Sequence, residues 1–242
     1  MATPCTDCPL HCRPLFQPQT AAETAFMQQF KRGELQVQAG TTLLLEGAAS
    51  PQLYTVLKGQ GLRYKTLEDG RRQVVNFVFP GDLLGLQAAL MGEMSHSAEA
   101  STDMVLCVFD RARIWDLFRD QPGRGYDLTW IAAQEEHFLG DALATVGQRD
   151  ALGRMAWALL KLWRRAEALQ MTTGNSTALP WRQQDLADAL GLSLVHTNKT
   201  LARLKREGVV QLQGGRLQVL DRARLAELAM SEDGEIITRP LF

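Results

Sequence analysis

The sequence predicts an α+β chain in which a jelly-roll β-barrel is followed by a long helix and a C-terminal winged helix-turn-helix. Three observations support this fold class. Short β-rich runs recur between residues 35 and 109, a proline-free amphipathic stretch covers residues 125–148, and two short helical patterns followed by a hairpin pattern cover residues 183–220. We therefore expect an N-terminal arm (1–19), a β-barrel domain (20–124), a long helix suited to dimerisation (125–148) and a winged-helix domain suited to DNA binding (149–242).

Composition is that of an ordinary globular protein, with 242 residues, 45% hydrophobic and 22% charged. No apolar run approaches the roughly 18 residues of a membrane helix, and the first residues lack the apolar core of a signal peptide. We expect a cytoplasmic protein with no membrane partner, in which the 4 Cys form no structural disulfides.

The near-neutral net charge of −1 conceals an uneven distribution. Residues 149–242 contain 14 Lys and Arg against 10 Asp and Glu, which leaves 12 against 17 for residues 1–148. A basic C-terminal part is what a surface that meets phosphates requires.

The N-terminal segment begins with three of the four cysteines, Cys5, Cys8 and Cys12, in a Pro-punctuated stretch that we expect to be irregular. Residues 20–30 then predict a short helix. Eight short strands follow, separated by Gly or Pro. They are predicted at 35–37, 41–45, 53–58, 61–66, 73–79, 82–86, 97–100 and 104–109, with a further short helix at 111–118.

The long helix carries one near-heptad stripe, which consists of Leu128, Ile131, Glu135, Phe138 and Ala142. Such a seam usually packs against a partner helix, so we predict that it forms a dimer interface. The alternative is that the stripe packs on the barrel of its own chain. A second, strongly apolar helix is predicted at 150–169, and a polar loop at 171–179.

The helix-turn-helix is predicted from Gln183 to Arg206. Gly191 is suited to end the first helix in the left-handed conformation, and Ser193 is suited to cap the second. The core-facing side of the second helix would carry Leu194, Thr197, Leu201 and Leu204. Two strands around Gly214 and Gly215 complete a winged helix, and the chain beyond residue 225 is expected to end in a frayed tail.

Three motifs resemble, together and in order, the Crp/Fnr superfamily of bacterial transcription regulators. Residues 53–59 (LYTVLKG) and 79–85 (FPGDLLG) are similar to the family's barrel motifs, and residues 184–193 (QDLADALGLS) to its entry to the recognition helix. The resemblance covers nearly the whole chain. It implies a cyclic-nucleotide-binding-like barrel, a homodimer paired through the long helix, binding to palindromic double-stranded promoter DNA, and RNA polymerase as a partner.

The resemblance also implies which residues contact DNA. By position, the family's base-reading residues correspond to Val195, His196, Asn198 and Lys199. Lys199 can donate to guanine and Asn198 can pair with adenine. Contacts to phosphates, which position the protein without specifying sequence, are expected from Ser193, Thr197, Arg203, Lys205, Arg206 and Arg216. Better-known members have Glu or Arg in place of Val195 and Lys199, so their operator sequence does not transfer.

Family members differ in what the barrel senses. Cyclic-nucleotide binders hold the phosphate with an arginine, but this sequence has no Arg between Arg72 and Arg111. We therefore predict no cyclic nucleotide as effector. Oxygen sensors that resemble the fumarate-nitrate reduction regulator instead bind a [4Fe–4S] cluster through four cysteines, which correspond here to Cys5, Cys8, Cys12 and Cys107.

Other interpretations of the cysteines stay open at this stage. Zinc also accepts four thiolates, Cys107 could be an inert core residue, and the pair Cys5 and Cys8 could be vestigial in a metal-free regulator. A ferredoxin-like redox protein would not need a winged helix. An enzyme is not expected, because the four histidines are far apart in sequence and no catalytic arrangement is recognisable.

Overall fold

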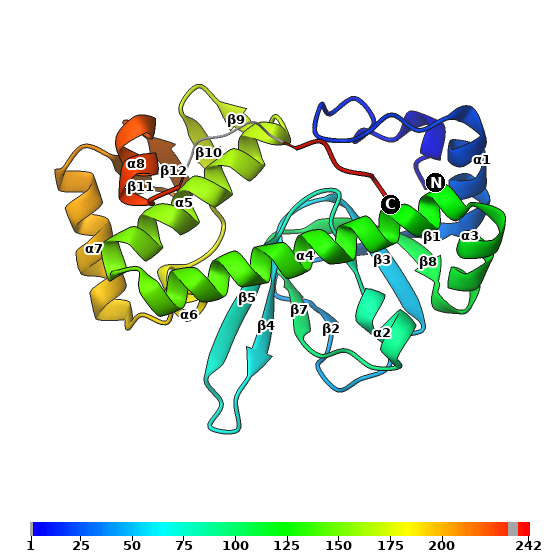
Figure 1. Cartoon of the computed structure of the whole chain (residues 1–242), viewed down its shortest axis with the longest axis horizontal. Helices are drawn as coiled ribbons and strands as arrows, with labels where there is room; N and C mark the ends of the chain where they lie inside the picture. Colours follow the sequence, from blue (N-terminus) through cyan, green and yellow to red (C-terminus); the bar gives the residue numbers. More distant parts are fainter. Residues whose placement is uncertain (1, 232–236) are drawn as a thin grey trace. The chain divides into compact units, whose positions relative to one another are not determined.

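The computed structural model describes residues 2–231 and 237–242. These residues divide into two compact units, Met1–Glu135 with Thr238–Phe242, and Glu136–Ile237. The division falls inside the longest helix, α4 (Pro122–Gln148), which is green in Figure 1. Barrel, long helix and winged helix-turn-helix occur in the order that the sequence predicts.

The N-terminal arm is packed rather than loose. It contains one short 3-10 helix, η1 (Cys5–Asp7), and buries Leu10, Leu15 and Phe16. The following helix α1 (Ala21–Phe30) confirms the prediction for residues 20–30. Its start is fixed by a capping box, because the Glu23 backbone N–H donates to the Thr20 hydroxyl and the Glu23 carboxylate accepts from the Thr20 backbone N–H.

The barrel consists of two four-stranded antiparallel sheets. The first has the order β1 (Lys31–Val37), β8 (Met104–Asp110), β3 (Gln52–Lys58) and β6 (Leu83–Leu84). The second has the order β2 (Thr42–Leu44), β7 (Ser97–Ala100), β4 (Gly61–Thr66) and β5 (Arg72–Val78). Alternate side chains of both sheets, among them Val56, Leu84 and Leu106, form the barrel core.

One predicted strand is shorter than expected. Residues 82–86 were predicted as extended, but the structure keeps only Leu83 and Leu84 in a strand and then forms helix α2 (Leu86–Met91). Gly85 has φ +93°, so the chain turns there into the helix. The segment from residue 111 to 120 forms η2 (Arg111–Arg113) and α3 (Ile114–Asp120), as predicted.

The second unit is built on the apolar helix α5 (Ala151–Ala168), whose first turn is capped by Asp150. Helices α6 (Gln183–Leu190), α7 (Leu194–Arg206) and α8 (Arg222–Leu228) accompany a sheet of order β11 (Val210–Gln213), β12 (Arg216–Val219), β10 (Ser176–Ala178) and β9 (Thr172–Thr173). The polar stretch 171–179, predicted as a loop, therefore contributes two strands to the wing sheet. Across the described residues no helix combines the length and apolarity that a membrane crossing needs.

The prediction of a frayed C-terminus is wrong for its last residues. Part of that segment, 232–236, lies outside the described residues. Leu241 and Phe242 are each only 4% exposed and belong to the barrel unit, where Figure 1 shows the C-terminus near the N-terminus.

Candidate functional site

Helix α7 is positioned by two local signals that the sequence predicts. Gly191 has φ +62° and ends α6, and the Ser193 hydroxyl accepts a hydrogen bond from the His196 backbone N–H at 3.2 Å. Leu201 and Leu204 anchor the inner face of α7 in the core of the unit. The cap therefore fixes where α7 begins, and the buried leucines fix its rotation about its own axis, so that the opposite face points outward.

All four predicted base-reading residues lie on that outer face and are exposed. They are Val195, His196, Asn198 and Lys199. Val195 is 64% exposed, so its methyl groups are available for contact with a partner. A surface that offers a cation, an amide and an apolar methyl pair has the groups needed to contact base edges in a major groove.

Positive charge surrounds this face. Lys205 and Arg206 are exposed in the last turn of α7, and Arg216 is exposed on the wing, where its Nε donates to the Ser176 hydroxyl at 2.9 Å. Arg203 is partly engaged, because its Nε lies 2.7 Å from Glu207 Oε1. These side chains place cations on both helix and wing, as phosphate contacts require.

Two predictions on α7 need correction. Thr197 was predicted both as a core residue and as a phosphate contact, but it is 0% exposed and its hydroxyl has no hydrogen-bond partner among the described residues. It is therefore a core residue only. Leu194 was predicted to face the core, yet it is 41% exposed because it begins the helix beyond the packed turns.

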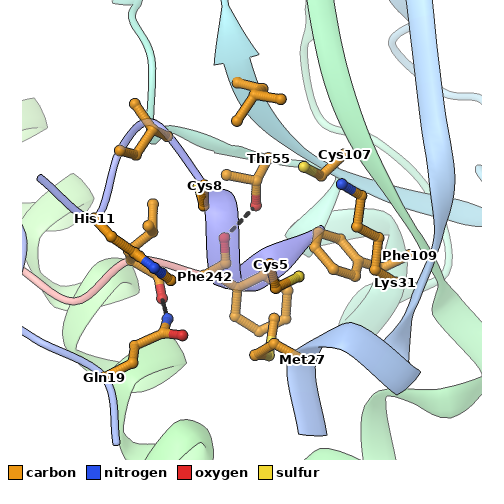
Figure 2. Close-up of a pocket in the computed structure, with 13 residues that line it drawn as sticks. Cys5, Cys8, His11, Gln19, Met27, Lys31, Thr55, Cys107, Phe109 and Phe242 are labelled. Atoms are coloured by element: carbon orange, nitrogen blue, oxygen red, sulfur yellow. Dashed lines mark hydrogen bonds between the residues drawn. The ribbon is translucent and has the colours of Figure 1, made fainter. Parts of the chain in front are cut away.

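A second site lies in the barrel unit, where the arm meets the first sheet. Figure 2 shows the sulfur-bearing side chains of Cys5, Cys8 and Cys107 around one pocket. The arm supplies the first two and strand β8 supplies the third. The other residues that line the pocket are Leu10, His11, Gln19, Met27, Lys31, Thr55, Leu57, Phe109, Leu241 and Phe242.

Lys31 is the polar centre of this pocket, and sequence reasoning missed it. Its Nζ donates to the Thr3 carbonyl at 2.7 Å and to Glu34 Oε1 at 2.8 Å, and Lys31 lines the same pocket as the Cys107 thiol. Burial raises the pKa of Cys107 to about 11, and the nearby ammonium of Lys31 only partly opposes this effect. The cation ties the arm to the barrel at the place where the thiols gather.

Cys12 does not line the pocket. It is exposed, and its thiol donates to the Pro9 carbonyl at 3.1 Å. Among residues 2–231 and 237–242, no three His, Cys, Asp or Glu side chains form a group that could hold a metal ion. Three of the four predicted ligands therefore line one pocket without converging on a common point, and Cys12 lies further along the arm.

The predicted dimer stripe on α4 is used within the chain. Leu128 and Ile131 are 2% and 4% exposed. Glu135 accepts a hydrogen bond from Arg63 Nη1 at 2.9 Å, and Phe138 stacks on Trp157 with centroids 6.0 Å apart. Ala142 is half-buried as well. Leu128 and Ile131 are thus covered within the chain, as the alternative predicted, whereas Phe138 packs on α5 rather than on the barrel. The assignment of the whole stripe to a dimer interface stays a prediction.

A different face of α4 is left uncovered. Leu139 is 47% exposed and Leu143 is 75% exposed, and they share this face with exposed Ala132, Glu136 and Gly140. These positions recur every three or four residues, so they form one side of the helix. The sequence contains two adjacent apolar stripes on this helix, and periodicity alone does not tell which of them forms a dimer interface.

Comparison with known proteins agrees with both domains. Residues 34–121 match the family model described as "Cyclic nucleotide-binding domain", and residues 153–228 match the one described as "Crp-like helix-turn-helix domain". The nitrogen fixation regulation protein FixK of Bradyrhizobium diazoefficiens is 31% identical over 225 residues, which cover 93% of each chain. The chain belongs to the Crp/Fnr family.

Two further similar proteins support this assignment over most of the chain. The transcriptional activator protein FnrL of Cereibacter sphaeroides is 30% identical, over 93% of this chain and 91% of its own. The solved structure of FixK2 from Bradyrhizobium japonicum has a TM-score of 0.74 at 26% identity and covers 84% of this chain and 98% of its own. The protein is therefore a DNA-binding transcription regulator of the Crp/Fnr type.

Proposed function

We propose that this Crp/Fnr regulator acts in the cytoplasm as a homodimer that binds palindromic promoter DNA and engages RNA polymerase there. The observation that carries the proposal is the outer face of α7, where Asn198 and Lys199 are exposed on a helix whose inner face is buried. Two such helices would enter successive major grooves about 34–36 Å apart. Because no Arg lies between Arg72 and Arg111, the barrel is not expected to respond to a cyclic nucleotide.

Dimerisation is assigned to the uncovered face of α4 that carries Leu139 and Leu143. Exposed leucines on one side of a long helix lose their contact with water when a second copy of the helix packs there. Gly140 lies between them and allows the two helices to approach closely.

Replacing Leu143 by Asp is expected to convert the dimer to a monomer at micromolar concentration, because a carboxylate would be buried in an apolar seam. Promoter affinity is expected to fall by at least about tenfold, since one half-site contributes less than two. Sedimentation velocity measures the first effect and fluorescence anisotropy the second. Leu90→Asp, at a leucine of α2 that is 56% exposed, is the matched control. A Leu143→Asp protein that stays dimeric would rule out this face.

The cysteine pocket is assigned to an oxygen-labile [4Fe–4S] cluster held by Cys5, Cys8, Cys12 and Cys107. The donor set fits this group in type, because four thiols are available, and in part in placement, because three line one pocket beside the cation Lys31. When bound, the cluster would supply a redox-labile link between arm and barrel. Cys12 has to turn inward from its hydrogen bond with Pro9 to complete the ligand set.

Contacts within the chain indicate how a link between arm and barrel would affect other parts of the barrel unit. Lys31 joins Thr3 of the arm to Glu34 of β1, and the Cys5 backbone N–H donates to Gln28 Oε1 of α1 at 2.7 Å. The arm thus rests on elements of the barrel unit, which also includes the first half of α4. A group that favours one arm position shifts the population of barrel conformations, and with it dimer and DNA affinity.

A metal-free regulator is the second candidate. It is favoured by one observation, namely that no three ligand side chains converge within the described residues. Purification without air, followed by iron, zinc and sulfide analysis, separates the two candidates. A brown sample that loses iron and promoter affinity in air supports the sensor, and a colourless sample that binds promoter DNA equally well with and without air supports the metal-free regulator.

A further inference from the structure

The C-terminal residues Arg239–Phe242 form part of the wall of the cysteine pocket. Leu241 and Phe242 line it together with Cys5, Cys8 and Cys107. In sequence these residues come after the winged helix, yet they belong to the compact unit that contains the barrel. The two ends of the chain therefore meet at one site.

Apolar burial holds the end of this segment. Phe242 is 4% exposed and meets Phe109 of β8 edge-on, with ring centroids 5.2 Å apart. It also makes an edge contact with Phe30 of α1, with centroids 6.2 Å apart. A buried aromatic ring removes a large apolar area from water, so Phe242 is an anchor of this wall.

Polar contacts fix the backbone of the same residues. The Thr55 hydroxyl donates to the Phe242 carbonyl at 2.7 Å, as the dashed line in Figure 2 shows. The Leu241 carbonyl accepts hydrogen bonds from Gln19 Nε2 at 2.9 Å and from the guanidinium of Arg124. Arg124 lies in the first turn of α4, so the segment contacts the arm, β3 and α4 together.

The segment also holds the cysteine-bearing arm directly. Arg239 forms an isolated parallel β-bridge with Phe16 of the arm, because its N–H donates to the Leu15 carbonyl at 2.8 Å and its carbonyl accepts from the Gln17 N–H at 2.9 Å. Its guanidinium lies 2.9 Å from Asp82 Oδ1, and both side chains are at most 10% exposed. Removing one partner of such a buried ion pair strongly destabilises the folded protein, because the other charge is left buried without compensation.

We propose that the segment Arg239–Phe242 positions the residues of the cysteine pocket. The segment clamps the arm on the barrel and shields Cys107 from solvent. The segment thereby controls access to the thiols and the lifetime of any cluster that they hold. Its role toward the thiols stands on geometry alone, and only its role toward a cluster depends on the proposed function.

Thiol labelling of reduced, metal-free protein tests the clamp. The rate at which N-ethylmaleimide modifies each cysteine is measured by mass spectrometry in the wild type and in Phe242→Ala and Arg239→Gln. We expect Cys107 to react at least about tenfold faster in both variants, because the pocket opens without global unfolding. Cys12, which is exposed, is the internal reference and is expected to react at the same rate in all proteins.

The control variant is Ile237→Ala, at a neighbouring side chain that is 71% exposed. It is expected to leave the Cys107 rate unchanged. Thermal unfolding curves show whether each variant is folded at the labelling temperature. If Phe242→Ala fails to fold, Arg239→Gln, which keeps Phe242 in place, still tests the clamp. An unchanged Cys107 rate in a folded variant would overturn the clamp.

Iron release separates this inference from the proposed function. If the anaerobically purified wild type holds iron, Phe242→Ala should lose it several-fold faster on exposure to air. If neither protein holds iron but Cys107 labelling is accelerated, the cluster hypothesis fails and the clamp remains. If both hold iron equally long and label equally fast, the clamp fails and the cluster hypothesis remains.

Discussion

Combined replacement of Lys199 by Glu and Asn198 by Ala is expected to abolish sequence-specific DNA binding, with at least a hundredfold loss of affinity for a cognate promoter. Each base contact from such side chains contributes about 1–3 kcal/mol, and the glutamate adds repulsion from nearby phosphates. Both side chains are exposed on α7, so the fold should be retained. Fluorescence anisotropy with specific and scrambled duplexes measures the loss.

The controls for this prediction separate specificity from charge. Lys58→Glu makes the same charge change at an exposed position of β3 in the barrel unit. Because this position lies outside the unit that carries α7, specific binding is expected to stay within about twofold of the wild type. Lys205→Ala should weaken specific and scrambled duplexes alike and reduce the salt dependence. If the Lys199 and Asn198 double variant preferred the specific duplex over the scrambled one as strongly as the wild type does, the assignment of α7 would be contradicted.

Serine in place of any of the four cysteines is expected to remove most of the iron from anaerobically purified protein. A [4Fe–4S] cluster uses four thiolates, and a hydroxyl is a poor substitute for one of them. Iron content of about four per protomer in the wild type should fall below about one in Cys5→Ser, Cys8→Ser, Cys12→Ser and Cys107→Ser. Visible absorbance and iron analysis give the readout without reference to DNA binding.

The pattern across these variants decides between ligand sets. Cys107→Ala and a thermal unfolding curve control for loss of packing at this buried position. Retention of iron in Cys12→Ser would show that this exposed cysteine is not a ligand. His11, which lines the pocket, would then be the next candidate for the fourth ligand. Stoichiometric zinc in place of iron in the anaerobic wild type would contradict the cluster.

Elements with local signals were predictable from sequence. The Thr20 and Glu23 pair begins α1, and Gly191 with Ser193 sets the turn before α7, because each signal acts within three or four residues. The outward face of α7 followed from the spacing of Leu201 and Leu204, whereas its assignment to base reading came from the resemblance to Crp/Fnr regulators and stays a prediction. The resemblance to Crp/Fnr regulators then supplied a function that the pattern alone left general.

Features that depend on distant contacts were not predictable. Gln19 and Leu241 are hydrogen-bonded across 222 positions of sequence, and no local pattern marks residues 239–242 as buried. On α4, Leu128 and Leu139 lie on stripes of similar apolar character, and only the tertiary contacts of the first stripe reveal that the second is free. Periodicity gives the faces of a helix but not their partners.

The most direct test of the account is selection of genomic DNA fragments by purified, anaerobically prepared protein, followed by sequencing of the bound pool. The account predicts enrichment of a palindrome with half-sites about one helical turn apart, and loss of that enrichment in the Lys199→Glu, Asn198→Ala protein. Recovery of the same fragments by wild type and variant, or recovery of no shared palindrome by the wild type, would contradict it.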